Sequence, residues 1–196
     1  MTEDSLLLSE IAGGSQRAFA IFYNTFKDKV YRTAFSYVRN EADAEEIAQD
    51  VFVEISKSAR TFNHKSSINT WVFKITVNKS LDKLRYQKAK KRFGFLTAIF
   101  GEKEEVLKDT IADPEHHGRQ ADKKESLKVL LSAIAKLPES QKTAIILTQL
   151  EQLKGKEAAE IMGTTAKAIE GLVLRGKATL KKEVEKIYHL RGKYEN

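Results

Sequence analysis

Residues 157–169 read EAAEIMGTTAKAI. Ala159 is small enough to let two helices approach closely, Gly163 can adopt the positive φ of a tight turn, and Ile169 is placed to pack back onto the first helix. These features predict a helix-turn-helix. In that motif the second helix enters the major groove of DNA, where Lys and Arg side chains reach base edges and phosphates. An αα-hairpin that binds nothing needs the same glycine turn, so the segment alone leaves both interpretations open.

The rest of the 196-residue chain is also expected to be helical. Only 2 Pro and 10 Gly stand in a sequence that is 31% charged, which disfavours many short strands joined by tight turns. Apolar residues recur at helical spacing after Gly14 and Ser15, and again after Asn40, which is placed to cap a helix. A further long helix is expected to start at Asn69, after a loop at 61–67.

Helical periodicity fades between Phe93 and Lys123, where acidic residues cluster and Pro114 interrupts any helix. An apolar stripe at helical spacing resumes at Leu127. The sequence therefore predicts an all-α fold of two small helical domains joined by a flexible linker, with the helix-turn-helix in the C-terminal domain. The predicted ranges are 1–92 for the N-terminal domain, 93–122 for the linker and 123–196 for the C-terminal domain.

The net charge of +7 is unevenly distributed along the chain. Residues 41–54 contain six acidic side chains and no basic one, whereas residues 79–92 contain seven basic side chains and one acidic one. A second basic tract lies at 167–193. A single Lys-rich helix is usually a solvated face, but two basic tracts within helical motifs indicate two contacts with a polyanion.

Several classes of protein are disfavoured by what the sequence lacks. The absence of cysteine excludes disulfides, thiolate metal sites and thiol nucleophiles. His116 and His117 are adjacent, which points them apart on a regular element, and no Gly-rich phosphate loop is present, so neither a metal or cofactor site nor an enzyme is expected. With no signal-like segment after Met1 and no apolar run of ~20 residues, the chain is expected to stay in the cytoplasm, without membrane insertion.

Three motifs follow one another along the chain. Residues 43–52 read DAEEIAQDVF. After them come Trp71, Val72, Ile75, Asn78, Leu81, Asp82, Leu84 and Arg85, and then Leu137, Pro138, Gln141 and the helix-turn-helix. Over nearly its whole length the chain resembles the extracytoplasmic-function class of bacterial RNA polymerase sigma factors. The resemblance implies a factor, not an enzyme, that directs core polymerase to specific promoters and initiates transcription.

In this family the first helical domain binds the polymerase clamp and opens the minus-ten promoter element, and the C-terminal domain reads the minus-thirty-five element. The resemblance implies that core RNA polymerase is bound by Asp43, Glu46, Gln49, Asp50 and Phe52. It implies that promoter DNA is bound by Asn63, His64, Lys65, Asn69, Lys74, Asn78, Arg85, Lys88, Lys167, Glu170, Gly171, Leu174, Arg175 and Lys177. Asn78 matches the asparagine that holds a flipped-out base, a role that suits an amide. An anti-sigma factor is a further partner that the resemblance leaves open.

The sequence departs from the family pattern in two places. Where a capping Ser or Thr is usual before the helix-turn-helix, the chain has Lys154 and Gly155, so the start of this helix should be weaker. Where basic residues are common in the second helix, the chain has Glu170, Gly171 and Leu172. The Glu170 carboxylate suits either a hydrogen bond from a cytosine amino group or an ion pair with a neighbouring Lys, and both remain open.

Two other functions are compatible with the sequence. A stand-alone helix-turn-helix transcriptional regulator with a helical N-terminal domain would bind its operator tightly by itself, whereas a sigma factor needs core polymerase. A helical adaptor that binds only protein would make the two basic tracts incidental. Transcription reconstituted with core polymerase distinguishes these three functions.

Overall fold

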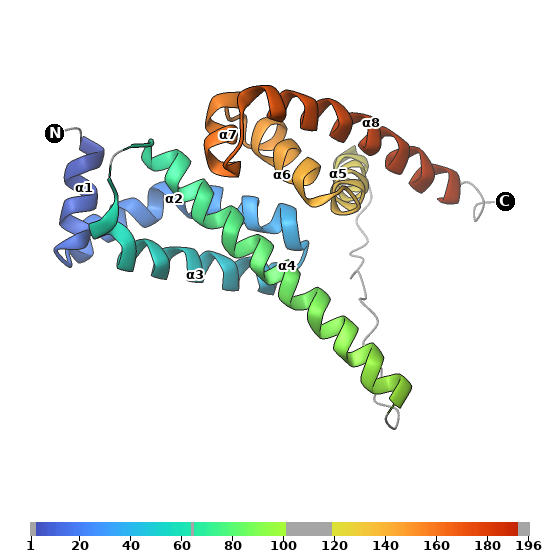
Figure 1. The fold of residues 1–196 in the computed structure, drawn as a ribbon, viewed down its shortest axis with the longest axis horizontal. Coiled ribbons are helices and arrows are strands. Elements are labelled where there is room, and N and C mark those ends of the chain that lie inside the picture. The colour runs from blue at the N-terminus through green and yellow to red at the C-terminus, as the bar shows by residue number, and fades with distance from the viewer. Residues whose placement is uncertain (1–2, 64, 101–118, 192–196) are drawn as a thin grey trace.

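The computed structural model describes residues 3–63, 65–100 and 119–191, and every regular element within them is helical. In chain order the elements are α1 (Glu3–Ala12), α2 (Gln16–Val38), α3 (Glu41–Ser58), the 3₁₀ turn η1 (Ala59–Thr61), α4 (Ile68–Phe100), α5 (Arg119–Ala135), α6 (Glu139–Ile145), the π-helical turn η2 (Ile146–Leu150), α7 (Gly155–Met162) and α8 (Ala166–Arg191). Figure 1 shows α1–α4, the N-terminal unit, lying against α5–α8, the C-terminal unit. The prediction of an all-α fold is confirmed.

The N-terminal unit is built around the packing of α2, α3 and α4. Phe22 of α2 and Val51 and Ile55 of α3 are fully buried between these helices. The turn from α2 to α3 is held by Asn40, whose Oδ1 accepts the Asp43 N–H at 2.9 Å, so the predicted cap is confirmed. The first helix, α1, was not predicted, although Leu8 is buried in the same core.

The long helix α4 differs from its predicted bounds at both ends. Its first turn is capped by Ser67, whose Oγ accepts the Thr70 N–H at 3.0 Å, and not by Asn69. At the other end the helix continues through Phe100, since no proline interrupts it. Of the predicted linker, 93–100 and 119–122 are therefore helical, and 101–118 lies outside the described residues.

The predicted helix-turn-helix is formed by α7 and α8. Gly163 has φ 62°, and Ile169 is 1% exposed in the C-terminal core. Lys154 gives α7 no side-chain cap, as expected, and instead the Glu157 Oε2 accepts the Lys154 N–H at 2.8 Å. The start of α8 is capped by Thr165, whose Oγ1 accepts the Ala168 N–H at 3.2 Å.

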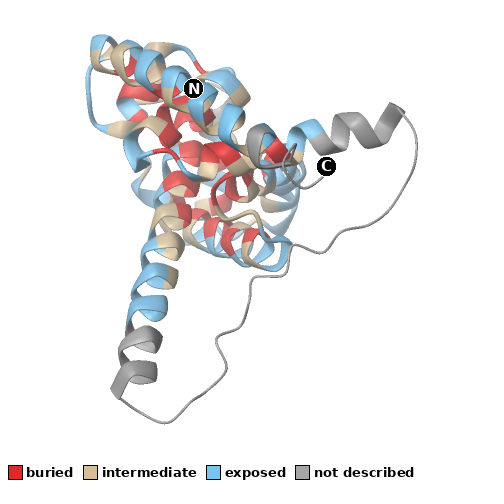
Figure 2. Cartoon of the chain, turned by 90° about the vertical axis from the view of Figure 1, so that its right-hand side faces the viewer, coloured by how far each residue is buried: buried red, intermediate tan, exposed pale blue. Residues whose placement is uncertain are grey.

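The two units share a hydrophobic core, which the sequence did not predict. Tyr37 of α2 and Phe73 and Val77 of α4 are 2–4% exposed, in one cluster with residues of the C-terminal unit. Figure 2 shows that buried residues continue across the junction, and residues 88–92 of α4 are exposed. The C-terminal unit is thus seated directly on α2 and α4.

Candidate polymerase and nucleic-acid interfaces

Helix α4 has three faces with different surroundings. One face contacts α3 and carries Val72, Thr76, Lys79, Lys83 and Gln87. A second face packs on the C-terminal unit through Phe73, Val77, Leu81 and Leu84. The third face is open to solvent and carries Lys74, Asn78 and Asp82, which recur at four-residue spacing. Only this third face is available to a ligand while both units stay packed.

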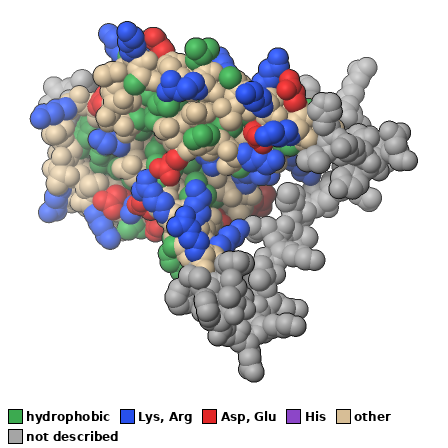
Figure 3. All heavy atoms as spheres, turned by 45° about the vertical axis from the view of Figure 1, so that its right-hand side comes forward, with side chains coloured by type: hydrophobic (Ala, Val, Ile, Leu, Met, Phe, Trp, Pro, Cys, Tyr) green, Lys and Arg blue, Asp and Glu red, His purple; other side chains and the backbone are tan. Residues whose placement is uncertain are grey.

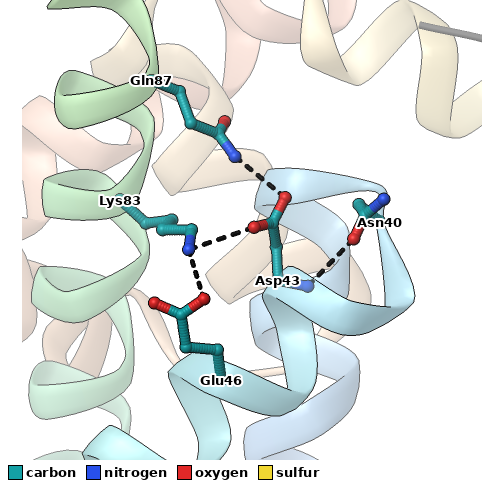
Figure 4. Close-up of polar contacts among 5 residues, drawn as sticks. All are labelled: Asn40, Asp43, Glu46, Lys83 and Gln87. Carbon is teal, nitrogen blue, oxygen red and sulfur yellow. Dashed lines mark hydrogen bonds and ion pairs between the residues drawn. The ribbon is translucent and has the colours of Figure 1, made fainter. Parts of the chain in front are cut away.

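The face of α4 that contacts α3 carries a polar network (Figure 4). The Lys83 Nζ lies 3.1 Å from an oxygen of Asp43 and 2.5 Å from an oxygen of Glu46. The Gln87 amide donates to the other Asp43 oxygen at 2.8 Å. The hydrogen bond that the Lys83 ammonium donates to Glu46 is the main cause that raises the pKa of Lys83. Two of the five predicted polymerase contacts therefore hold α4 against α3.

Two of the other predicted polymerase contacts lie in a groove between α2 and α3. Gln49 and Phe52 line this groove, which has a volume of about 870 Å³. Phe52 is 5% exposed and forms its floor, with its ring centroid 4.7 Å from that of Tyr23 and 6.4 Å from that of Phe19. Asp50 is exposed and forms no ion pair with a described residue. The groove therefore has an apolar floor, and Asp50 is not one of its lining residues.

The predicted minus-ten contacts on α4 are only partly available. Lys74, Asn78 and Lys88 are exposed, and the Asn78 side chain forms no hydrogen bond with a described residue. Arg85 is instead engaged by ion pairs, 3.2 Å from Asp82 and 2.8 Å from Glu139 of the C-terminal unit. Figure 3 shows basic side chains along the projecting half of α4.

The loop before α4 carries the remaining predicted contacts of this unit. Asn63 and Lys65 are exposed, and the Asn63 Oδ1 accepts the Lys65 N–H at 3.2 Å. His64 lies outside the described residues. Asn69 is half-buried and accepts a hydrogen bond from the Lys29 ammonium at 3.4 Å, so its amide is already used within the N-terminal unit. Trp71 is half-buried against the N-terminal core.

The predicted minus-thirty-five contacts lie on the outward side of α8. Lys167, Glu170, Leu174, Arg175 and Lys177 are all exposed. The Arg175 guanidinium lies over Gly171, where a Cβ would be 3.4 Å from its Nη1. Glu170 forms no ion pair with a described residue, so the structure does not support the alternative in which a neighbouring Lys holds it. The carboxylate is available to a ligand.

Charged groups are partly desolvated where the two units meet. Burial raises the pKa of Glu151, and Thr33, Arg32 and Lys29 of α2 partly offset this shift. Burial also lowers the pKa of Lys142 in α6. Across the junction the Arg39 guanidinium donates to the Ser132 hydroxyl at 2.8 Å. Because charged forms are disfavoured in such a setting, this packing is less stable than an apolar junction of the same size.

Sequence reasoning missed two sets of interface residues. Tyr23 is one of the apolar residues at helical spacing after Ser15, yet it is 43% exposed beside the groove, and Val53 of α3 is 50% exposed there. Phe73 and Val77 were not assigned to a contact between the units. Their apolar character was visible, but helical spacing shows only that a face is buried and not which element covers it.

Other kinds of site were also sought in the described ranges. Every helix in 3–63, 65–100 and 119–191 is too short or too polar to cross a bilayer. Those residues contain no group of three His, Asp or Glu side chains arranged to hold a metal ion. His116 and His117 lie outside them.

A helix-turn-helix joined to a helical unit with exposed Lys and Asn side chains on an open helix face is typical of a DNA-directed transcription protein, and comparison with known families specifies the class. Residues 22–90 match the family model of Sigma-70 region 2, and residues 127–180 match that of Sigma-70, region 4. The chain belongs to the extracytoplasmic-function class of RNA polymerase sigma factors. It directs core polymerase to promoters and initiates transcription.

Individual relatives match over most of their length. The RNA polymerase sigma factor SigV of Bacillus subtilis is 32% identical over 149 residues, 76% of this chain and 80% of SigV. The ECF sigma factor SigW of the same organism is 26% identical over 179 residues, 90% of this chain and 94% of SigW. The structure of CnrH in complex with the cytosolic domain of CnrY has a TM-score of 0.67 and 24% identity, covering 93% of this chain and 97% of CnrH, which shows the same fold.

Proposed function

We propose that three surfaces divide the steps of transcription initiation. The α2–α3 groove and Asp50 bind core polymerase, the open face of α4 holds the melted minus-ten element, and the outward side of α8 reads the minus-thirty-five element. The observation that carries the proposal is the environment of α4. Two of its faces are covered, and the third presents Lys74 and Asn78 to solvent.

The groove supports the polymerase-binding part of the proposal. Its aromatic floor offers apolar contact area to a partner helix, and the lining carboxylates of Asp28 and Glu45 can pair with basic side chains. Asp43 and Glu46 act differently in this scheme, because they are bound to Lys83. Their role is to position α4 relative to α3, so that the groove and the open face of α4 keep a fixed position relative to each other.

The open face of α4 suits a single strand of DNA. The Asn78 amide can donate to and accept from the edge of a base that has left the stack. Lys74 and Lys88 are exposed on the same helix and can neutralise phosphates on either side. Asn63 and Lys65 lie in the loop before the helix, where they are proposed to contact the same DNA strand. His64 remains a sequence-based prediction.

The closed packing of the two units must open in this scheme. The two promoter elements are centred about 25 base pairs apart, or roughly 85 Å at ~3.4 Å per base pair. The C-terminal unit, by contrast, shares a core with α2 and α4. We therefore propose that polymerase and promoter hold the two units apart, and that the free chain binds promoter duplex weakly.

The partners follow from the class of protein. Core polymerase and promoter DNA are the expected ligands, and the chain is proposed to act in the cytoplasm, where transcription takes place. An anti-sigma factor is proposed as a further partner. Support comes from similar folds solved as complexes, CnrH with the cytosolic domain of CnrY and a Bartonella quintana sigma factor RpoE with the anti-sigma factor NepR.

The test of the minus-ten assignment is Asn78→Ala in the assembled holoenzyme. Promoter opening, followed by permanganate reactivity of unpaired thymines, should fall, and base preference at one minus-ten position should blur. The slope of log affinity against log salt should stay the same, because no phosphate contact is lost. Asn24→Ala, an exposed asparagine on α2, is the matched control and should change neither quantity. An altered salt slope with intact base preference contradicts the assignment.

A further inference from the structure

The outward side of α8 has an apolar centre. Ile169 and Gly176 are buried on the opposite side of the helix. Residues three or four apart share a helix face, so Lys167, Glu170 and Leu174 form one outward stripe. Leu174 is 73% exposed, the most exposed large apolar side chain of the described residues. On a helix placed in the major groove, this side chain lies nearest the base edges.

The charges around this centre suit DNA, with one exception. Lys167, Arg175, Lys177 and Lys181 are exposed around the stripe and favour contact with phosphates. Glu170 is an exposed carboxylate among them that forms no ion pair with a described residue. A phosphate would repel it. The carboxylate is therefore favourable in the groove only if it accepts a hydrogen bond from a base.

The chemistry of the groove restricts which base this can be. Cytosine presents its N4 amino donor there, whereas adenine presents its N6 donor beside the N7 acceptor, which repels a carboxylate. Cytosine is therefore the better ligand for Glu170. The apolar group of the groove is the thymine methyl, which suits Leu174. Four residues span ~6 Å along a helix, so the two side chains reach base pairs one or two steps apart.

The surface around Leu174 is compatible with this fit. Glu170, Val173 and Leu174 border a shallow, mainly apolar hollow of about 330 Å³. Gly171 has no side chain, which leaves room for the Arg175 guanidinium to lie across the helix. Leu174 therefore projects beside an apolar hollow and is free to contact a base edge.

We propose that Glu170 and Leu174 determine the sequence preference of the upstream promoter element, Glu170 for cytosine and Leu174 for thymine one or two base pairs away. The inference rests on the proposed function, in which α8 reads that element. It concerns the two residues that depart from a basic recognition surface.

The test selects a promoter library, randomised in its upstream segment, with holoenzymes that carry wild-type, Glu170→Gln or Leu174→Ala chains. The wild type should enrich a cytosine and a thymine within two base pairs. Each variant should lose preference at its own position only, by ~10-fold, as expected for one mismatched pair. Lys181→Ala, on the same side of the helix, is the control and should weaken binding to all sequences alike.

A second measurement tests the atoms involved. Deoxyuridine in place of thymine removes only the methyl group, so it should weaken wild-type binding about as much as Leu174→Ala does. It should have no further effect on the Leu174→Ala holoenzyme. If the wild type selects an upstream sequence and both variants select the same one, the inference is wrong while the proposed function stands. If the wild type selects no upstream sequence, upstream reading by α8 fails, and the inference fails with it.

Discussion

Replacing Lys83 with methionine tests whether the acids of α3 hold α4 in place. Methionine keeps most of the apolar stem, which matters because the Lys83 side chain is only 18% exposed, but it removes the ammonium. The pair with Asp43, itself 25% exposed, is partly shielded from water. Glu46 is the main cause of the raised pKa of Lys83, but it is 60% exposed, so solvent screening reduces its contribution to stability. We expect the free energy of unfolding to fall by about 1 to 2 kcal/mol, which lies between the values for exposed and buried ion pairs. For a chain of this size that lowers the melting temperature by roughly 2 to 8 °C.

The assay combines thermal unfolding, followed by circular dichroism, with equilibrium binding to core polymerase below the unfolding transition. Lys83→Met should lower the melting temperature and leave polymerase affinity close to wild type. The matched variant Asp50→Lys should do the opposite, because Asp50 is exposed and unpaired with any described residue. If Lys83→Met melts like the wild type, or weakens polymerase binding as strongly as Asp50→Lys does, the conclusion that Asp43 and Glu46 hold α4 against α3 is refuted.

Three further outcomes are expected. Burial raises the pKa of Glu151 from 4.5, so its contribution to stability is full below pH 4.5 and is lost as the pH rises through the shifted value. Glu151→Gln should therefore have a higher melting temperature than the wild type at pH 7. Its melting temperature, measured between pH 4 and 8, should also vary less with pH. Gly176→Ala places a Cβ 2.9 Å from a buried α6 side chain and should lower the melting temperature, whereas Gly171→Ala meets only the flexible Arg175 and should not. Replacing Arg175 and Lys177 with Ala should flatten the slope of log holoenzyme affinity against log salt by up to ~2 units, at ~0.9 per phosphate contact.

Local patterns predicted most of the fold. The apolar spacing in α2 and α3, the Asn40 cap and the Gly163 turn all act over three or four residues, within the reach of sequence reasoning. The bounds of α4 were less predictable, because Ser67 and Asn69 are both good caps and only the loop conformation selects Ser67. Contact between the two units depends on the placement of whole helices, which no local pattern contains.

The candidate site was predictable as a list of residue types, but not as a set of pairings. An acidic stripe on one helix and a basic tract on another were both visible in the sequence. Their register, which brings Lys83 between Asp43 and Glu46, depends on how α3 and α4 pack. The same applies to the ion pair of Arg85 with Glu139 across the junction, while the DNA contact of Arg85 stays a prediction. Whether a neighbouring Lys lies close enough to Glu170 for an ion pair also depends on packing that the sequence does not contain.

Transcription from a reconstituted system tests the central claim most directly. The chain, core polymerase and a promoter fragment selected by the holoenzyme are combined, and run-off transcripts are measured with intact and scrambled minus-ten and minus-thirty-five elements. A sigma factor that works as described gives transcripts only when core polymerase and both elements are present, while the free chain binds the duplex weakly. Tight, sequence-selective duplex binding by the free chain, with no transcription when core polymerase is added, would contradict the account and favour a stand-alone regulator.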